Sequence, residues 1–201
     1  MFEGGQQPEQ RVCLRRLSIL LVESSEQELA ILDQMMIGFA AKNITKRRNS
    51  TTAIASIHSD PPDLMIVSAA LPGMDGYDLV RWLRFNQPSE SRSMPVILLT
   101  AHTRAADVMK ARDCGANFIV TKPIVPKVLY TRIEWISKDE RPFIETKAYV
   151  GPERRFKSLG PPPGMSGRRK GDLSLQIAEA TAPNMSQADI DALMNPKRGP
   201  R

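Results

Sequence analysis

The sequence predicts an α/β fold in which a five-stranded parallel sheet is doubly wound, with helices on both faces. Several short segments are continuously apolar, such as LSILLV at 17–22 and VILLT at 96–100, as expected of strands buried on both faces. These segments alternate with helical patterns five times within about 120 residues. Regular alternation of strand and helix is typical of a parallel sheet covered by helices.

The first half of this pattern begins with the apolar strand 17–22. Ser24 or Ser25 can cap the helix that follows, and the acidic residues of its first turn suit the helix dipole. Pro61 and Pro62 end the second helix, because proline disfavours helical backbone before it. The expected elements are a strand at 17–22, a helix at 28–40 with apolar residues at 29, 32, 36 and 39, a weak strand at 43–47, a helix at 51–58 and a strand at 64–67.

The second half continues the alternation. Pro88 ends the third helix, and Gly115 suits the residue after the end of the fourth. Lys122 and Pro123 form a turn before the last amphipathic helix. The expected elements are a helix at 77–85, a strand at 96–100, a helix at 104–114, a strand at 118–120 and a helix at 127–136.

Composition excludes several classes of protein. Of the 201 residues 41% are apolar, enough for one core, and no apolar run approaches the roughly 18 residues that span a bilayer. The polar start, MFEGGQQPEQ, does not resemble a signal peptide, so we expect a soluble, cytoplasmic protein. Cys13 and Cys114 should be reduced and unpaired, and His58 and His102 lack a triad or metal constellation. We therefore expect no enzyme activity and no metal site.

The chain beyond the repeats changes character. We expect a flexible N-terminus at 1–16, a domain at 17–137, a largely disordered Pro/Gly/Arg-rich linker at 138–183 and a short amphipathic helix at 184–196. Within the linker, IETKAYV could add an extended segment to a sheet. Residues 147–170 carry a net charge of +6 and residues 171–195 a net charge of −4. The basic block lacks a recognised nucleic-acid module, which favours a solvated or protein-binding linker.

The final segment, PNMSQADIDALMNPKR, is predicted to be a helix that needs a partner surface. Ser186 can cap it, with Asp189 three residues on as a short version of the capping box. One apolar face at helical spacing is formed by Met185, Ile190, Leu193 and Met194. A helix this short is not stable alone, so it should fold against a groove.

Polar residues lie where the predicted strands end. In parallel sheets a binding crevice lies beyond the carboxyl ends of the strands. The residues at these ends are Glu23, Ser24, Ser68, Thr100 and Lys122. They are the candidate site before any family is considered.

The segments LLVESS, DLMIVSAALPGMDGYDLV, MPVILLTA and GANFIVTKP, in this order and spacing, resemble the receiver domain of two-component response regulators. The resemblance covers 17–137 and implies a flavodoxin-like fold. By position, Glu23 and Ser24 occupy the family's Mg²⁺-binding acidic pair, and Ser68 stands where the family has its phosphoacceptor aspartate. Thr100 matches the switch hydroxyl, Lys122 and Pro123 match the lysine–proline turn, and Ile119 stands at the usual switch aromatic.

These departures predict a pocket that does not handle phosphate. Mg²⁺ prefers hard oxygen ligands, and of the three expected carboxylates only Glu23 remains. Ser68 is a neutral hydroxyl with no general base nearby, and so a poor nucleophile. We expect weak or absent Mg²⁺ binding and no other cofactor. Lys122 should pair with Glu23 or bond to the Thr100 and Ser68 hydroxyls, which would lock the pocket in one state. The alternative is that these residues are polar remnants without a role.

The last helix carries a second resemblance. MSQADIDALMN is similar to the N-terminal peptide of flagellar motor switch proteins, which docks on an activated chemotaxis receiver. The residues in register are Ser186, Gln187, Ala188, Ile190, Asp191, Ala192 and Leu193. The resemblance implies that this segment, with its flanking Met185 and Met194, binds another receiver or a motility protein, although it lies at the opposite end of the chain.

Three functional hypotheses follow. The leading one is a non-catalytic signalling adaptor, in chemotaxis or motility control, whose helix captures an activated receiver. In the second, the helix docks on its own receiver, on the face of the last two helices and the fifth strand. The third makes the basic block a nucleic-acid anchor. A homodimer through the last two receiver helices is a further prediction.

Overall fold

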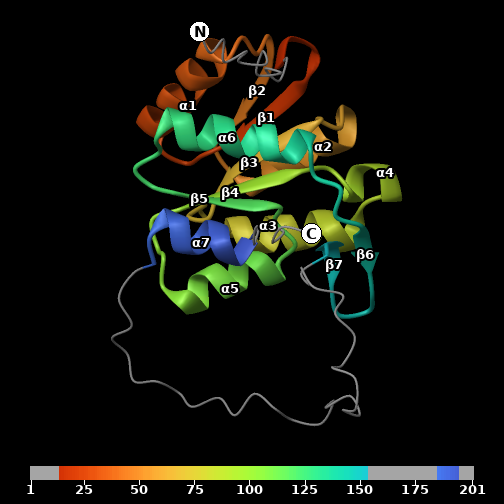
Figure 1. The fold of residues 1–201 in the computed structure, drawn as a ribbon. Coiled ribbons are helices and arrows are strands. Elements are labelled where there is room, and N and C mark those ends of the chain that lie inside the picture. Colours follow the sequence, from red (N-terminus) through yellow and green to blue (C-terminus); the bar gives the residue numbers. More distant parts are fainter. Residues whose placement is uncertain (1–13, 154–184, 195–201) are drawn as a thin grey trace, which may run out of the picture.

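The computed structural model describes residues 14–153 and 185–194, which form the ribbon of Figure 1. The expected order of strands and helices in the domain is confirmed, with bounds shifted by one or two residues, and the last helix begins three residues later than the predicted 184–196. A short 3₁₀ helix, η1, the four-residue α4 and the strands β6 and β7 are additions. The elements are η1 (Leu14–Arg16), β1 (Ser18–Val22), α1 (Glu26–Gly38), β2 (Asn43–Arg47), α2 (Ser50–Ser59), β3 (Leu64–Ser68), α3 (Gly76–Asn86), α4 (Ser89–Arg92), β4 (Val96–Thr100), α5 (Ala105–Asp113), β5 (Phe118–Thr121), α6 (Pro126–Ser137), β6 (Phe143–Glu145), β7 (Val150–Pro152) and α7 (Gln187–Met194).

The five main strands form one parallel sheet in the order β2-β1-β3-β4-β5. The predicted doubly wound parallel sheet is therefore confirmed. β3 and β4 are buried along their whole length, which explains why their sequences are apolar without alternation. β5 lies at one edge of this sheet, so among the described residues no strand pairs with the outer side of its backbone.

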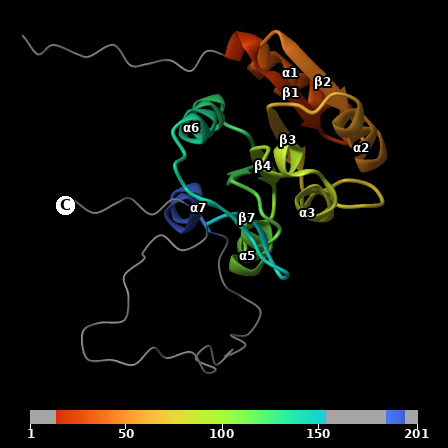
Figure 2. The same cartoon turned by 90° about the vertical axis from the view of Figure 1, so that its right-hand side faces the viewer.

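Two apolar cores lie on opposite faces of the sheet. α1 and α6 cover one face, where Leu32 and Leu129 are fully buried against residues of the strands. α2, α3 and α5 cover the other face. Figures 1 and 2 show these helices on the two sides of the sheet.

The segment after α6 corrects one prediction. Residues 138–183 were expected to form a largely disordered linker in which IETKAYV, residues 144–150, could be extended, and within it β6 and β7 pair with each other as an antiparallel hairpin. Tyr149 and Val150 are only 7% and 5% exposed, and the Tyr149 hydroxyl donates to the Pro152 carbonyl at 2.7 Å. The hairpin orders because it buries these two side chains, which a charge-rich composition did not reveal. Residues 154–183 of the predicted linker and the N-terminal residues 1–13 lie outside the described part of the chain.

The hairpin rests beside Arg84 of α3, a fully buried arginine. Its guanidinium donates to the carbonyls of Gly115, Arg92 and Met94 at 3.0, 2.5 and 2.8 Å, and to Asn117 Oδ1 at 3.1 Å. Burial lowers the pKa of Arg84 to about 10, so the group stays charged at neutral pH. This arginine joins α3, the end of α4 and the start of β5 under the hairpin.

The last helix lies on its own receiver domain. α7 packs against β5, and both ribbon views place it between α5 and α6. Ile190 is fully buried and Met194 is 3% exposed, both within the core that α2, α3 and α5 cover. The short helix is thus stabilised by a groove of this chain, at the open edge of the sheet.

Candidate functional site: the strand-end pocket and the face that α7 covers

The carboxyl ends of β1, β3, β4 and β5 lie together at one end of the sheet. The parallel register aligns Val22 with Val67, Ser68 with Leu99, and Thr100 with Thr121. Glu23, Ser68, Thr100 and Lys122 are therefore neighbours although they lie far apart in the sequence. Ser68 is fully buried, and Glu23 and Thr100 are each 2% exposed.

The start of α3 closes one side of this pocket. A Cβ atom on Gly76 would lie 2.1 Å from the Ser68 carbonyl oxygen, so only glycine permits this approach of helix to strand. The Gly76 N–H donates to the Ala69 carbonyl at 3.0 Å. The glycine therefore helps to hold the end of β3, and with it Ser68, in place.

Lys122 is the centre of the pocket. Its Nζ donates to Glu23 Oε2 at 2.6 Å, to Glu28 Oε2 at 2.5 Å and to Ser68 Oγ at 3.0 Å. We call these four residues the Lys122 cluster. The peptide bond between Lys122 and Pro123 is cis.

The charge of Lys122 controls the ionisation of Glu23. Burial alone would raise the pKa of Glu23, but hydrogen bonds from Lys122 and the Ser25 N–H, with the lysine's charge, hold that pKa below its ordinary value of 4.5. Glu23 is thus ionised at neutral pH, and its negative charge is compensated inside the protein.

Two of the predicted pocket residues face other partners. Ser24 Oγ donates to the Ala70 carbonyl at 3.1 Å and lies 3.3 Å from Glu23 Oε1, so it braces the loop after β3. Thr100 Oγ1 accepts from the His102 N–H at 3.0 Å and donates to the His102 carbonyl at 3.1 Å. The hydroxyl of Thr100 thus holds its own loop, and of the two hydroxyls predicted to bond to Lys122 it is that of Ser68 that accepts from the lysine.

The residues present do not fit a magnesium ion. Glu23 and Glu28 bring carboxylates to the pocket, and the Lys122 ammonium group lies against both of them. Within residues 14–153 and 185–194, no group of three or more His, Cys, Asp or Glu side chains lies together. A cation would have to displace the lysine from both carboxylates.

The second region of interest is the surface under α7, which we call the docking face. It comprises Thr103 before α5, Ile119 and Thr121 of β5, and Arg132 of α6. The Met185 N–H donates to the Thr103 carbonyl at 2.8 Å, and Arg132 forms an ion pair with Asp191. Burial lowers the pKa of Arg132, and the charge of Asp191 opposes that effect.

Gln187 binds the open edge of β5 through its side-chain amide. Its Oε1 accepts from the Thr121 N–H at 2.8 Å, and its Nε2 donates to the Ile119 carbonyl at 3.0 Å. The same Nε2 donates to Asp191 Oδ1 at 2.8 Å. One side chain thus supplies the bonds that a neighbouring strand would otherwise make.

The predicted cap and apolar face of α7 are present. Ser186 Oγ accepts from the Asp189 N–H and the Asp189 carboxylate accepts from the Ser186 N–H, each at 3.2 Å. Met185, Ile190 and Met194 contact the core. The side chain of Leu193 lies outside the described residues, so its predicted place on this face stays a prediction.

Sequence reasoning missed three of the residues that complete these sites. Glu28 was assigned only to the first turn of a helix, and Arg132 and Thr121 had no role. Glu28 could have been found, because the first turn of the helix after the first strand lies at the same edge as the strand ends. The contacts of Arg132 and Thr121 depend on where α7 lies, which no local pattern encodes.

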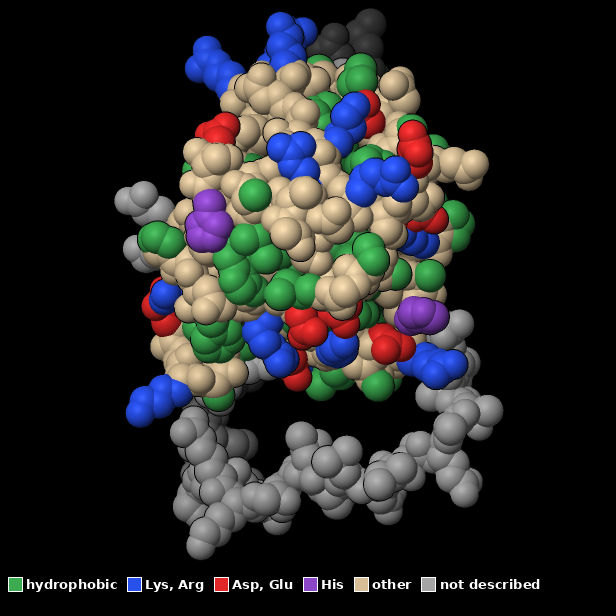
Figure 3. All heavy atoms as spheres, turned by 180° about the vertical axis from the view of Figure 1, so that it is seen from behind, with side chains coloured by type: hydrophobic (Ala, Val, Ile, Leu, Met, Phe, Trp, Pro, Cys, Tyr) green, Lys and Arg blue, Asp and Glu red, His purple; other side chains and the backbone are tan. Residues whose placement is uncertain are grey.

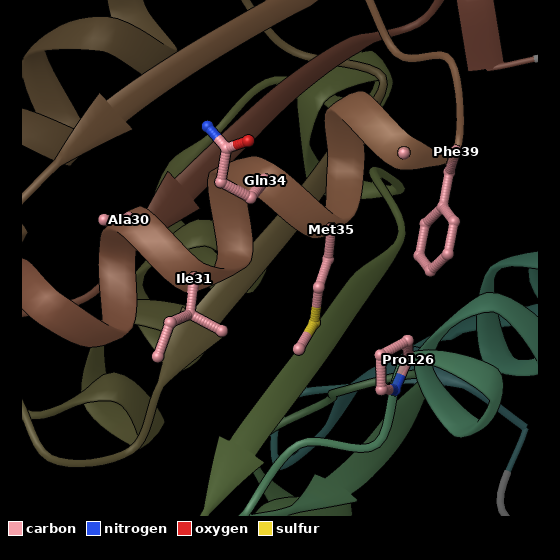
Figure 4. Close-up of a pocket in the computed structure, with 7 residues that line it drawn as sticks. Ala30, Ile31, Gln34, Met35, Phe39 and Pro126 are labelled. Carbon is pink, nitrogen blue, oxygen red and sulfur yellow. The ribbon is translucent and has the colours of Figure 1, made fainter.

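A separate apolar hollow lies between α1 and the start of α6 (Figure 4), on the opposite face of the sheet from α3 and α5. Figure 4 shows Ile31, Met35, Phe39 and Pro126 around it. Its lining offers no acid, base or nucleophile, so it has no part in the chemistry of the pocket.

Among the helices that the structure describes, none has the length and apolar character needed to cross a bilayer. Figure 3 shows the face opposite to that of Figure 1, where basic side chains lie next to acidic ones over much of the lower half. The nucleic-acid hypothesis concerns the basic block of residues 147–170 and stays a prediction. Most of the basic block, residues 154–170, lies outside the described residues.

Comparisons with known proteins agree with this architecture. The family model for the response regulator receiver domain matches residues 19–134. Chemotaxis protein CheY of Pseudomonas aeruginosa is 28% identical over 120 residues, which cover 60% of this chain and 95% of CheY. Response regulator PleD of Caulobacter vibrioides is also 28% identical over 120 residues, but these cover only 26% of PleD.

Solved structures give the same result. The receiver domain of a signal transduction histidine kinase from Syntrophus aciditrophicus is 34% identical, with a TM-score of 0.55, over 66% of this chain and 99% of that one. Chemotaxis protein CheY4 of Vibrio cholerae, at 20% identity and a TM-score of 0.54, covers 59% of this chain and 96% of its own and supports the fold alone.

Proposed function

The chain belongs to the response regulator receiver family, and from that membership we propose that it is a non-catalytic signalling protein working by helix exchange. In this proposal α7 alternates between its own docking face and the corresponding face of another receiver. The pocket at the strand ends supports the fold and the docking face, and it does not transfer phosphoryl groups. The domain would consist of residues 17–137 with the hairpin as an ordered extension.

The make-up of the pocket supports the non-catalytic part of the proposal. Ser68 stands where the family has its phosphoacceptor aspartate, and it is fully buried and bonded to Lys122. Phosphoryl transfer depends on metal and charge neutralisation around the acceptor. Here the lysine lies against both carboxylates that could hold a metal, and a serine without a base is a poor nucleophile.

The seating of α7 on its own receiver is the observation that carries the proposal. Ile190 and Met194 are buried, and Asp191 is paired with Arg132. These are residues that the similarity to the motor switch peptide assigns to receiver binding. A helix that uses one surface for both contacts cannot make them at the same time, so docking in cis excludes capture in trans.

The proposed partner in trans is an activated receiver of the chemotaxis type. The similarity of MSQADIDALMN to the peptide of flagellar motor switch proteins and the relation of the fold to CheY point the same way. Self-docking lowers the apparent affinity for such a partner by the fraction of open molecules. The chain would therefore engage its partner only when the partner competes with the docking face. A homodimer through α5 and α6 would compete with α7 for part of the same face.

The test is fluorescence anisotropy with a labelled peptide of residues 182–198. The peptide is titrated with a chemotaxis receiver, with and without Mg²⁺ and beryllofluoride, and with this chain in full length and lacking residues 181–201. We expect binding to the activated chemotaxis receiver and to the shortened chain. The full-length chain should bind at least tenfold more weakly, because its own α7 occupies the docking face.

The matched control is the same peptide carrying Ile190→Ala and Leu193→Ala, which should bind none of these proteins. Equal binding of both peptides would contradict a specific docked helix. Binding to the shortened chain but not to the chemotaxis receiver would contradict the proposed partner in trans and would support a receiver whose helix docks only on its own domain. An unchanged receiver NMR spectrum after deletion of 181–201 would remove the docking itself.

A further inference from the structure

The contacts of α7 identify the chemistry that the docking face selects. We infer that the open edge of β5 is a recognition site for the side-chain amide of a glutamine at the first residue of a docked helix, and that Gln187 is the specificity-determining residue of α7. The partner class is a capped helix that carries glutamine at this position and aspartate four residues later. This inference deepens the proposed function and rests on it.

The geometry uses the polar atoms of the amide in a way that few side chains can copy. Oε1 accepts from the Thr121 N–H at 2.8 Å, while Nε2 donates to the Ile119 carbonyl at 3.0 Å. The site therefore offers one donor and one acceptor from alternate residues of an edge strand. An amide presents the complementary acceptor and donor on one rigid plane.

Asp191 extends the site by one helical turn. Its Oδ1 accepts from Gln187 Nε2 at 2.8 Å, and its other oxygen pairs with Arg132. The aspartate thus orients the amide and neutralises an arginine that is only 4% exposed. Positions i and i+4 face the same side of a helix, which explains the spacing.

The apolar residues of the helix do not provide this selectivity. Ile190 and Met194 fill a groove, and a groove accepts many aliphatic side chains of similar size. Gln187 is different, because a partner without the amide leaves the Thr121 N–H and the Ile119 carbonyl without their bonds to the helix. A buried polar group left unbonded discriminates more strongly than a lost methylene.

Gln187→Glu is the most informative variant, because glutamate has the shape of glutamine but its ionised carboxylate cannot donate a hydrogen bond. The added carboxylate would face the Ile119 carbonyl oxygen, which carries a partial negative charge, and the Asp191 carboxylate, so an acceptor would meet two acceptors. Near a helix N-terminus an added acidic group favours the helix itself, so weaker docking of Gln187→Glu cannot come from a weaker helix. Ala188→Glu is the matched control, because it adds the same charge at an exposed neighbouring position.

The measurement is amide hydrogen exchange by NMR on the full-length chain. The Thr121 amide reports the contact directly, and the Lys122 amide, which donates to the Thr100 carbonyl at 2.9 Å inside the sheet, is the internal reference. We expect Thr121 to exchange at least tenfold faster in Gln187→Glu and several-fold faster in Gln187→Ala. Lys122 should keep its rate in both, and Ala188→Glu should match the parent.

A second arm tests the partner class. Unlabelled peptide of residues 184–196 is added to the ¹⁵N-labelled chain, and the α7 signals are followed. The parent peptide should displace α7, and the peptide carrying Gln187→Glu should need at least tenfold more to do so.

The outcomes separate the inference from the proposal beneath it. If Thr121 exchange is unchanged in Gln187→Glu but rises in Ile190→Ala, the helix docks and the role of Gln187 is wrong. If Thr121 exchanges in the parent as fast as in the chain lacking 181–201, the docking fails as well. Equal displacement by both peptides would also overturn the role of the amide.

Discussion

Lys122 holds three side chains, which come from the residue after β1, from the first turn of α1 and from the end of β3. Of the two carboxylates Glu23 is the more buried, at 2% exposure, so its charge depends on the lysine for compensation. Removing one partner of a buried pair leaves an unpaired charge, which destabilises far more than loss of an exposed pair. The Lys122 cluster is thus the point in the pocket where a single substitution should matter most.

Lys122→Met is expected to lower the free energy of unfolding by about 3 kcal/mol, because Glu23 loses its compensating charge. Chemical denaturation at neutral pH measures the change. Lys46→Met is the matched control: Lys46 pairs with Asp33 at 2.7 Å but is 47% exposed, and its loss should change stability by roughly 0.5 kcal/mol. Equal effects of the two variants would contradict the structural role of the cluster.

Acid should weaken the fold through Glu23. The pKa of this carboxyl is lower in the folded state than its ordinary value of 4.5, so below that pH the unfolded chain binds more protons. The stabilisation is complete above about pH 4.5 and is lost as the pH falls through the folded pKa. Unfolding between pH 6 and pH 3.5 should therefore show a smaller loss of stability in Glu23→Gln than in the parent chain.

At the scale of elements, the hairpin of β6 and β7 forms within a segment whose composition predicted a largely disordered linker. It depends on a close approach to the turn after α5. Gly115 has a φ of +96°, and a Cβ atom there would lie 2.6 Å from the Val150 carbonyl oxygen. Both the backbone conformation and the contact require glycine.

Gly115→Ala is expected to destabilise the chain by about 2 kcal/mol and to loosen the hairpin, since the added methyl group meets backbone that cannot move aside. Thermal unfolding gives the stability, and hydrogen exchange of residues 143–152 gives the local effect. Gly38→Ala is the control, because nothing lies within 4 Å of its Cβ position and alanine favours the helix. A hairpin as protected in Gly115→Ala as in the parent would refute this dependence.

For the molecule as a whole, α7 links the two sites through the backbone. Gln187 of the helix accepts from the Thr121 N–H, and Thr121 is the residue before Lys122. Met185, two residues before the helix, donates to the carbonyl of Thr103, in the loop after β4 that begins at Thr100. The docked segment therefore contacts both the end of β5 and the loop after β4, which leave the pocket at Lys122 and Thr100. In the proposal the pocket maintains this face in one state.

A phosphoryl mimic should therefore leave α7 where it is. Addition of Mg²⁺ and beryllofluoride to the full-length chain is expected to change neither the α7 signals nor Thr121 exchange in NMR. Ser68→Asp should behave in the same way, because the lysine still lies against Glu23 and Glu28. Release of α7 by the mimic in the parent chain would overturn the proposed loss of phosphoryl control.

The sequence by itself determined the sheet, its five strands and the strand-end pocket. The strands can be predicted from short stretches of sequence, such as the continuous apolar run at 96–100. The cap at Ser186 on the last helix is likewise local and forms as predicted. The family resemblance added the roles expected of Ser68 and Lys122. The resemblance to the motor switch peptide singled out Gln187, Ile190 and Asp191 on the last helix.

Only the tertiary structure decided between the predicted sites of α7, on its own receiver or on another, and only it showed that Glu28 completes the Lys122 cluster and that residues 143–152 form a hairpin. In each case the outcome depends on partners distant in sequence: Arg132 with Asp191, Lys122 with Glu28, and Gly115 with Val150. A polar or glycine residue shows what it can bond or permit, but its sequence neighbours do not show what the fold places beside it. For α7 the deciding factor is its packing on the outer side of β5, which gives the Thr121 N–H a hydrogen-bond partner and buries Ile190 in the same contact.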